Sequence, residues 1–140
     1  MRLSDTAGMA TTNVELTLQA YEVFNRRDLD ALLALFDEDI EIESRIVAME
    51  GAFRGHEGAR SWYDAFLEAF PDYTVEPGEL RELGDDLTLC HLHGVGHGAG
   101  SGMTMIDPFW HVTRWRDGKM VWWRNCATEA DALEAAGLQT

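Results

Sequence analysis

The second half of the chain carries the feature that most restricts its fold, a series of turn signals at β-hairpin spacing. Turn-forming residues cluster in Gly84-Asp85-Asp86, from Gly98 to Gly102, and in Arg116-Asp117-Gly118. These clusters separate strands predicted at about 73–83, 87–97, 103–116 and 119–127. Long strands in such a meander twist and curl, and a curled sheet leaves a concave face for helices to close.

The first half of the chain begins with helical signals. Thr12 and Glu15 have the spacing of a capping box, which predicts a helix beginning just after Thr12. Asp28 is placed to cap a second, short helix. The predicted apolar side of that helix comprises Leu29, Leu32, Leu33, Leu35 and Phe36. Residues 40–45 then alternate apolar or small with charged side chains, which predicts a strand with one buried face.

Two further helices complete the pattern. The third is predicted over about residues 57–70, and Pro71 ends it. Thr128 can cap a short closing helix that Gly137 terminates. Helices first and a meander of strands afterwards indicate an α+β fold, not a parallel α/β fold.

Length and charge limit the organisation and the partners. A chain of 140 residues suits one domain, which we predict over residues 13–140, after a disordered or extended tail over residues 1–12. The chain has 25 acidic against 11 basic residues, for a formal charge of −14. This field repels phosphate groups, so we expect neither nucleic acid nor an anionic membrane as a partner.

The sequence also predicts the compartment and the state of the thiols. The N-terminal residues lack the apolar core of a signal peptide, and no apolar run approaches the ~18 residues of a membrane span. We therefore expect a cytoplasmic protein. Cys90 and Cys126 lie in apolar strand-like segments, where buried free thiols are expected rather than a disulfide.

Three blocks of sequence, in this order, resemble the SnoaL-like polyketide cyclases. The blocks are AYEVFNRRDLDALLALFDEDIEIE, FRGHEGARSWYDAF and HVTRWRDGKMVWWRN, within residues 13–138. These cyclases belong to the nuclear-transport-factor-2-like superfamily, with ketosteroid isomerases, limonene-epoxide hydrolases and scytalone dehydratases. The resemblance implies a cone, in which a curved antiparallel sheet of about five or six strands wraps around three helices and a pocket. It also implies a homodimer through the outer face of the sheet, but no particular reaction.

The catalytic residues of the ketosteroid isomerases are not present at the matching positions. The resemblance places their Asp base at Ser44, their Tyr donor at Ala20 and their Asp donor at His111. Serine and alanine cannot perform these roles, so the resemblance does not extend to steroid isomerisation.

The catalytic residues of the epoxide hydrolases and cyclases are also missing from the matching positions. Leu92 and Gly94 fall where the hydrolases have an Arg and an Asp. Asn125 falls at the remaining Asp, which is also the acid/base position of the cyclases. An asparagine can bind and orient a ligand, but it does not exchange protons at neutral pH.

His111 is the remaining candidate for proton transfer. Asp107, Phe109 and His111 share one strand face, which the isomerase register makes concave. An imidazole titrating near pH 6–7 there would act as acid and base, with Asn125 holding a carbonyl or enolate oxygen. The predicted ligand-binding residues are Tyr21, Ser44, Trp62, Phe66, Asp107, Phe109 and Trp123. The alternative is that His111 is a hydrogen-bonded core residue and that the aromatic side chains are core as well.

A histidine row marks the preceding strand. His91, His93 and His97 have the spacing of a chelating pair with a third residue, but the same register directs them to the convex face. We therefore predict no metal site, with the alternative that a bulge near Gly94 or Gly96 turns part of the row inward. Gly94 and Gly96 on the concave side are expected to leave room for a ligand.

Two functions remain open. One is cofactor-independent acid/base catalysis on an apolar carbonyl compound, as a cyclase, isomerase or dehydratase. The other is a binding module of the same fold that sequesters a small hydrophobic molecule. In both cases we expect a homodimer through the convex face, where His93, Trp110, Val112 and Trp122 are predicted to point outward.

Overall fold

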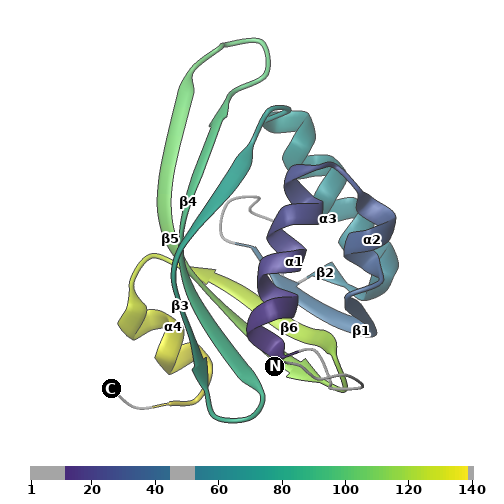
Figure 1. Ribbon diagram of the computed structural model, residues 1–140. Helices are drawn as coiled ribbons and strands as arrows, with labels where there is room; N and C mark the ends of the chain where they lie inside the picture. The colour runs from purple at the N-terminus through teal and green to yellow at the C-terminus, as the bar shows by residue number, and fades with distance from the viewer. Residues whose placement is uncertain (1–11, 45–52, 139–140) are drawn as a thin grey trace, which may run out of the picture.

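The computed structural model describes residues 12–44 and 53–138 of the chain. The predicted tail over residues 1–12 lies outside this part except for Thr12. The elements, in chain order, are α1 (Asn13–Asn25), α2 (Leu29–Leu33), β1 (Phe36–Glu43), β2 (Phe53–Arg54), α3 (Gly55–Ala69), β3 (Thr74–Leu83), β4 (Leu87–His97), β5 (Thr104–Arg116), β6 (Lys119–Cys126) and α4 (Glu129–Ala135). Figure 1 shows α1, α2 and α3 on one face of a curved sheet and α4 on the other. The predicted α+β fold is confirmed.

The sheet has six strands in the order β2-β1-β6-β5-β4-β3. All neighbouring pairs are antiparallel except β1 and β6, which run parallel. The expectation of a purely antiparallel sheet was therefore wrong at this one pair. The strand β1 belongs to the helical first half of the chain and joins the end of the meander from outside, so no hairpin connection fixes its direction.

The local helix signals are confirmed at the termini. The Thr12 hydroxyl accepts from the Glu15 amide at 3.1 Å, and Glu15 Oε1 accepts from the Thr12 amide at 2.9 Å. Thr128 caps α4 through the Asp131 amide at 3.1 Å. Gly137 follows α4 with a φ of +83°, a left-handed conformation that glycine adopts at little cost.

The second helix is shorter than predicted. Asp28 does accept from the Ala31 amide at 3.1 Å, but α2 ends at Leu33 and β1 begins at Phe36. The apolar run through Leu35 and Phe36 fits a helix pattern and a buried strand equally well. In the structure Phe36 is the first residue of β1.

Two apolar clusters lie on opposite faces of the sheet. The larger one fills the space between the concave face and α1 to α3, and includes Phe24, Trp62 and Trp123. The smaller one lies between the convex face and α4, and includes Leu89 and Val112. Val112 was predicted to point outward; it does lie on the convex face, but α4 covers it completely.

Two further predictions concern the cysteines and the glycines of β4. Cys90 and Cys126 are both buried and unbridged, which confirms the prediction of free thiols. The expectation that Gly94 and Gly96 leave room for a ligand was wrong, because Tyr73 occupies the space. A Cβ atom on Gly94 would lie 1.7 Å from the Tyr73 hydroxyl oxygen, and one on Gly96 would lie 3.0 Å from the Tyr73 Cα atom.

Candidate functional site

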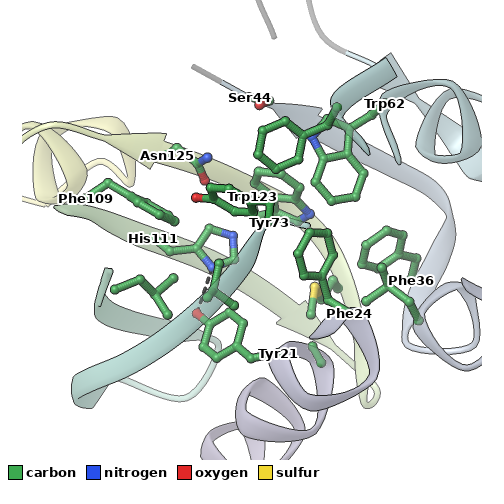
Figure 2. A pocket seen from close by; sticks show the side chains of 16 residues that line it. Tyr21, Phe24, Phe36, Ser44, Trp62, Tyr73, Phe109, His111, Trp123 and Asn125 are labelled. Carbon is green, nitrogen blue, oxygen red and sulfur yellow. Dashed lines mark hydrogen bonds between the residues drawn. The ribbon is translucent and has the colours of Figure 1, made fainter. Parts of the chain in front are cut away.

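A cavity of about 70 Å³ lies in the concave core, between the sheet and the three N-terminal helices (Figure 2). Its sixteen lining residues come from α1, α2 and α3, from the start of β1 and from β3 to β6, with Ser44 just after β1 and Tyr73 just before β3. Most of the wall is apolar: Ala20, Phe24, Leu32, Phe36, Trp62, Phe66, Val75, Leu92, Phe109, Met120 and Trp123. The polar side chains of the lining are few, and none of them is an Asp or a Glu.

The first polar feature is the pair formed by Tyr21 and His111. The hydroxyl of Tyr21 on α1 lies 2.8 Å from Nδ1 of His111 on β5, and both side chains are buried. The imidazole also packs edge-on against Trp123, with ring centroids 4.8 Å apart. The helix α1 thus positions the histidine ring from the side opposite the sheet.

Burial keeps both partners of this pair uncharged. It lowers the pKa of His111 from 6.5 to about 3, because the imidazolium form would lose its hydration in an apolar site. The sequence-based expectation that His111 titrates near pH 6–7 was therefore wrong. Burial, with a smaller contribution from the nearby Cys90 thiol, raises the pKa of Tyr21 well above 10.

The second polar feature is the side chain of Asn125 on β6. His111 and Asn125 are direct partners in the β5–β6 register, and both side chains face the cavity. Asn125 Oδ1 is buried and accepts no hydrogen bond within the described part of the chain. A buried acceptor of this kind costs about 1–3 kcal/mol when it stays unpaired, so a donor from a ligand or a water molecule would be stabilised here.

The structure brings nearly all of the predicted site residues together. His111 and Asn125 line the cavity, as do Tyr21, Ser44, Trp62, Phe66, Phe109 and Trp123. Asp107 does not line it, although it shares a strand face with Phe109 and His111. It lies further toward the β4–β5 turn, and alternation along a strand gives the face of a residue but not its depth.

Sequence reasoning missed several lining residues. Phe36 was assigned to a helix, and Tyr73 precedes the first residue of β3. Phe24 lies on α1 with Tyr21, and its ring packs against Trp62 and Phe66. The i, i+3 spacing of Tyr21 and Phe24 carries this signal, because such residues share a helix face.

The histidine row lies on the opposite face of the sheet, as the register predicted. His91 stacks on Trp110 with ring centroids 4.6 Å apart and contacts the His93 ring at 5.1 Å. His97 is exposed, and its Nδ1 lies 2.6 Å from Asp72 Oδ2. Across residues 12–44 and 53–138, no three His, Cys, Asp or Glu side chains form a group that could hold a metal ion.

In the same part of the chain, none of the helices has the length and apolarity needed to span a membrane.

Residues 18–123 match the model of the SnoaL-like domain. No curated protein matches the chain at a significant level. Solved structures do match the chain, and three of them show which kinds of protein share its fold.

One similar structure is an NTF2-like protein of unknown function from Burkholderia pseudomallei, with a TM-score of 0.76 and 20% identity over 89% of this chain and 97% of the other. A second is SalBIII, an epoxide hydrolase/cyclase-like enzyme with a role in pyran ring formation in the polyether salinomycin. Its TM-score is 0.71, with 20% identity over 84% of this chain and 91% of the other.

A third similar structure is RV0760c from Mycobacterium tuberculosis in complex with estradiol-17beta-hemisuccinate. Its TM-score is 0.70, with 20% identity over 79% of this chain and 88% of the other. At these identities the likeness establishes the fold.

Proposed function

This chain belongs to the SnoaL-like domain family, and we propose that it binds a small, uncharged, largely apolar molecule in the cavity of the concave core. The observation that carries this proposal is the Asn125 Oδ1 atom, buried next to His111 in a mostly apolar cavity and without a hydrogen-bond partner among the described residues. A cavity kept only by imperfect packing would be lined by apolar atoms alone, because each unpaired polar atom adds a cost.

Charge and size restrict the ligand. None of the described lining residues is a carboxylate or a basic side chain other than His111, which burial keeps neutral. An ion would therefore enter without a counter-charge, at a cost of several kcal/mol. The volume of about 70 Å³ is well below the roughly 300–1,000 Å³ of pockets for drug-sized ligands, so it fits a compact molecule or the head of a longer one.

A second function, cofactor-independent acid/base catalysis, is favoured by the 2.8 Å contact between Tyr21 and His111. It would be an isomerase, cyclase or dehydratase reaction on a carbonyl or polyketide-like compound. The cyclase-like description of SalBIII supports this class of chemistry. With a pKa of about 3, His111 is a weak base at neutral pH, so its neutral ring would serve chiefly to polarise the substrate oxygen.

Binding is tested first by native mass spectrometry of the purified protein, which identifies a co-purifying molecule by its mass. The matched variants are Asn125→Leu in the cavity and His93→Leu on the opposite face. We expect the adduct to be lost or strongly reduced in the former only. Equal adduct in both variants, or an adduct that an unrelated surface substitution removes, contradicts the proposal.

Catalysis is tested separately with a simple probe, the exchange of the α-hydrogens of cyclopentanone in D₂O, followed by proton NMR. If the site is catalytic, His111→Ala lowers the protein-dependent rate by ~10²–10⁴-fold. Asn125→Ala costs about 3 kcal/mol of transition-state stabilisation, as for one oxyanion donor, because in the catalytic case the amide N–H₂ of Asn125 would donate to the enolate oxygen. His91→Ala and His93→Ala leave the rate unchanged. Exchange no faster than in buffer would rule out enolisation of this probe.

For assembly, we propose a cytoplasmic homodimer through the open part of the convex face. The exposed fractions of Val95 (42%) and Ile106 (68%) support it, as does the half-buried Trp110 further along the same face of β5. Val112 takes no part, because α4 covers it. Sedimentation of the parent protein and of Ile106→Glu tests the dimer. A parent protein that stays monomeric at micromolar concentration contradicts it.

A further inference from the structure

Building on the proposed binding function, we propose that the cavity is specific for a hydroxyl group, as in an alcohol, an enol or a phenol. The specificity arises because Tyr21 fixes His111 in the tautomer with its proton on Nε2. Tyr21 acts here as a positioning residue, and the imidazole of His111 and the amide of Asn125 contact the ligand.

The first step is the direction of the hydrogen bond between Tyr21 and His111. A phenol O–H is a stronger acid than a neutral imidazole N–H, and an imidazole nitrogen is a stronger acceptor than a phenol oxygen. The Tyr21 hydroxyl therefore donates to Nδ1 across 2.8 Å, and the ring proton of His111 lies on Nε2. Burial, which raises the pKa of Tyr21 and lowers that of His111, keeps this bond neutral on both sides.

Cys90 does not compete for the Tyr21 proton. Its thiol is within hydrogen-bonding reach of the Tyr21 hydroxyl, and burial raises the pKa of the thiol to about 11, so the sulfur stays a neutral thiol. The Cys90 S–H is directed to the carbonyl oxygen of His91, with Sγ 3.6 Å from that oxygen. A thiol sulfur is a weak acceptor compared with an imidazole nitrogen, so the hydroxyl proton goes to Nδ1.

The second step is the pair of groups that remains for a ligand. Figure 2 shows His111 and Asn125 side by side on neighbouring strands, with the second ring nitrogen pointing away from Tyr21. Directly opposed residues have Cβ atoms about 4.5–5.5 Å apart, so one ligand atom can reach both side chains. His111 Nε2–H is a donor, and the hydrogen bond that the described residues make to this ring is at Nδ1. Asn125 Oδ1 is a buried acceptor without a partner among the described residues, and the Tyr73 hydroxyl lines the same cavity.

Only a group that accepts and donates through one oxygen satisfies both. A hydroxyl oxygen accepts from Nε2–H and donates its proton to Oδ1. A ketone or ether oxygen accepts from Nε2–H but leaves Oδ1 unpaired in its buried position. We expect this difference to weaken binding of the ketone by about 5- to 150-fold, which corresponds to about 1–3 kcal/mol.

The test uses two probes of equal size, cyclopentanol and cyclopentanone, titrated into the ¹⁵N-labelled protein and followed by NMR. The parent protein should bind the alcohol at least 5-fold more tightly than the ketone. In Tyr21→Phe the His111 tautomer is no longer fixed, because Nδ1 loses its donor, so the ratio should fall toward one. Tyr63→Phe is the matched control: Tyr63 is buried against Phe24 but does not line the cavity, and its loss should leave the ratio unchanged.

A second measurement needs no variant. Long-range ¹H–¹⁵N spectra of the unliganded parent report which nitrogen of His111 carries the proton. Protonation at Nε2 supports the inference, and protonation at Nδ1 overturns it. A ketone that binds as tightly as the alcohol also overturns it, while leaving the proposed binding function intact. If neither probe binds, the proposed function fails for this class of molecule, and the hydroxyl specificity fails with it.

Discussion

The two faces of the sheet use similar residues in opposite ways. On the concave face, His111 is buried, hydrogen-bonded to Tyr21 and packed against Trp123. On the convex face, His93 is exposed and His91 lies against Trp110 at the protein surface. Alternation along β6 places two adjacent residues, Trp122 and Trp123, in different environments.

This difference teaches that the face, rather than the residue type, determines the physical role. The concave face excludes water, so each polar atom there must find a partner, and Asn125 Oδ1 has none within the described residues. The convex face tolerates histidines because water solvates them, except where α4 covers the sheet. The following substitutions test the contrast in pairs, and the free energy of unfolding in urea is the common readout.

The largest contrast is expected between Trp123→Ala and Trp122→Ala. Trp123 is 4% exposed and contacts both Trp62 and His111, so its truncation leaves a large void in the main core. We expect a loss of about 3–5 kcal/mol. Trp122 is half-buried, beside the α4 cluster and under the Arg114 guanidinium, and should cost less than half as much. Unfolding is followed by far-ultraviolet circular dichroism, and equal losses would show that the two faces are not distinct.

The next effect concerns the contact between Tyr73 and the glycines of β4. In Gly94→Ala the new Cβ would lie 1.7 Å from the Tyr73 hydroxyl oxygen, so the tyrosine ring must move. Overpacking of this kind costs about 1–3 kcal/mol. Gly96→Ala is the graded control, because its Cβ would lie 3.0 Å from the Tyr73 Cα atom, a much milder overlap than at Gly94. A Gly94→Ala protein as stable as the parent would mean that Tyr73 has free space beside it.

Sequence patterns predicted most of the secondary structure, because local chemistry determines it. The turns around Gly84 and Gly118 and the caps at Thr12 and Thr128 each depend on a few neighbouring residues. Alternation along β5 also grouped His111 with Phe109 on one face, and the resemblance to the isomerases assigned that face to the concave side, where both residues line the cavity. These signals act over fewer than ten residues, so one sequence is enough to recognise them.

The remaining features depend on contacts between distant segments. The parallel pairing of β1 with β6 joins residues about 80 positions apart, and no turn signal encodes it. The loss of ligand space at Gly94 comes from Tyr73, and the covering of Val112 comes from α4. The pKa of His111 depends on the depth of its burial, which a strand pattern does not give.

The histidines of the two faces should also differ in their effect on pH dependence. The pKa of His111 is about 3 in the folded state, against about 6.5 in an unfolded chain. Between these values the unfolded chain binds a proton that the folded protein does not, so stability is full above pH 6.5 and falls as the pH decreases. From pH 6.5 to 5 the parent should lose about 1–2 kcal/mol more than His111→Gln. His93→Gln should retain the parent slope, and a parent slope in His111→Gln would contradict the assignment.

The smallest contrast is expected within the convex face itself, between Val112→Ala and Val95→Ala. The two substitutions are chemically identical and lie on adjacent strands of the same face. Val112 is 0% exposed under α4, whereas Val95 is 42% exposed beyond it. Removing the two methyl groups of Val112 should cost about 1–2 kcal/mol, because α4 cannot collapse fully onto the space they leave. Val95→Ala should stay within about 0.5 kcal/mol of the parent, as is usual for surface positions.

Measuring Val112→Ala and Val95→Ala at different protein concentrations also tests the proposed dimer. If the open part of the convex face is a dimer interface, Val95→Ala weakens association, and its apparent cost rises with protein concentration because dimerisation stabilises the folded state by mass action. The cost of Val112→Ala should not change, because α4 of the same chain covers that residue. Urea unfolding at two concentrations a hundredfold apart distinguishes the cases. A concentration-dependent cost at Val112 would show that α4 moves away from the sheet on association, and a constant cost at Val95 would place the interface elsewhere.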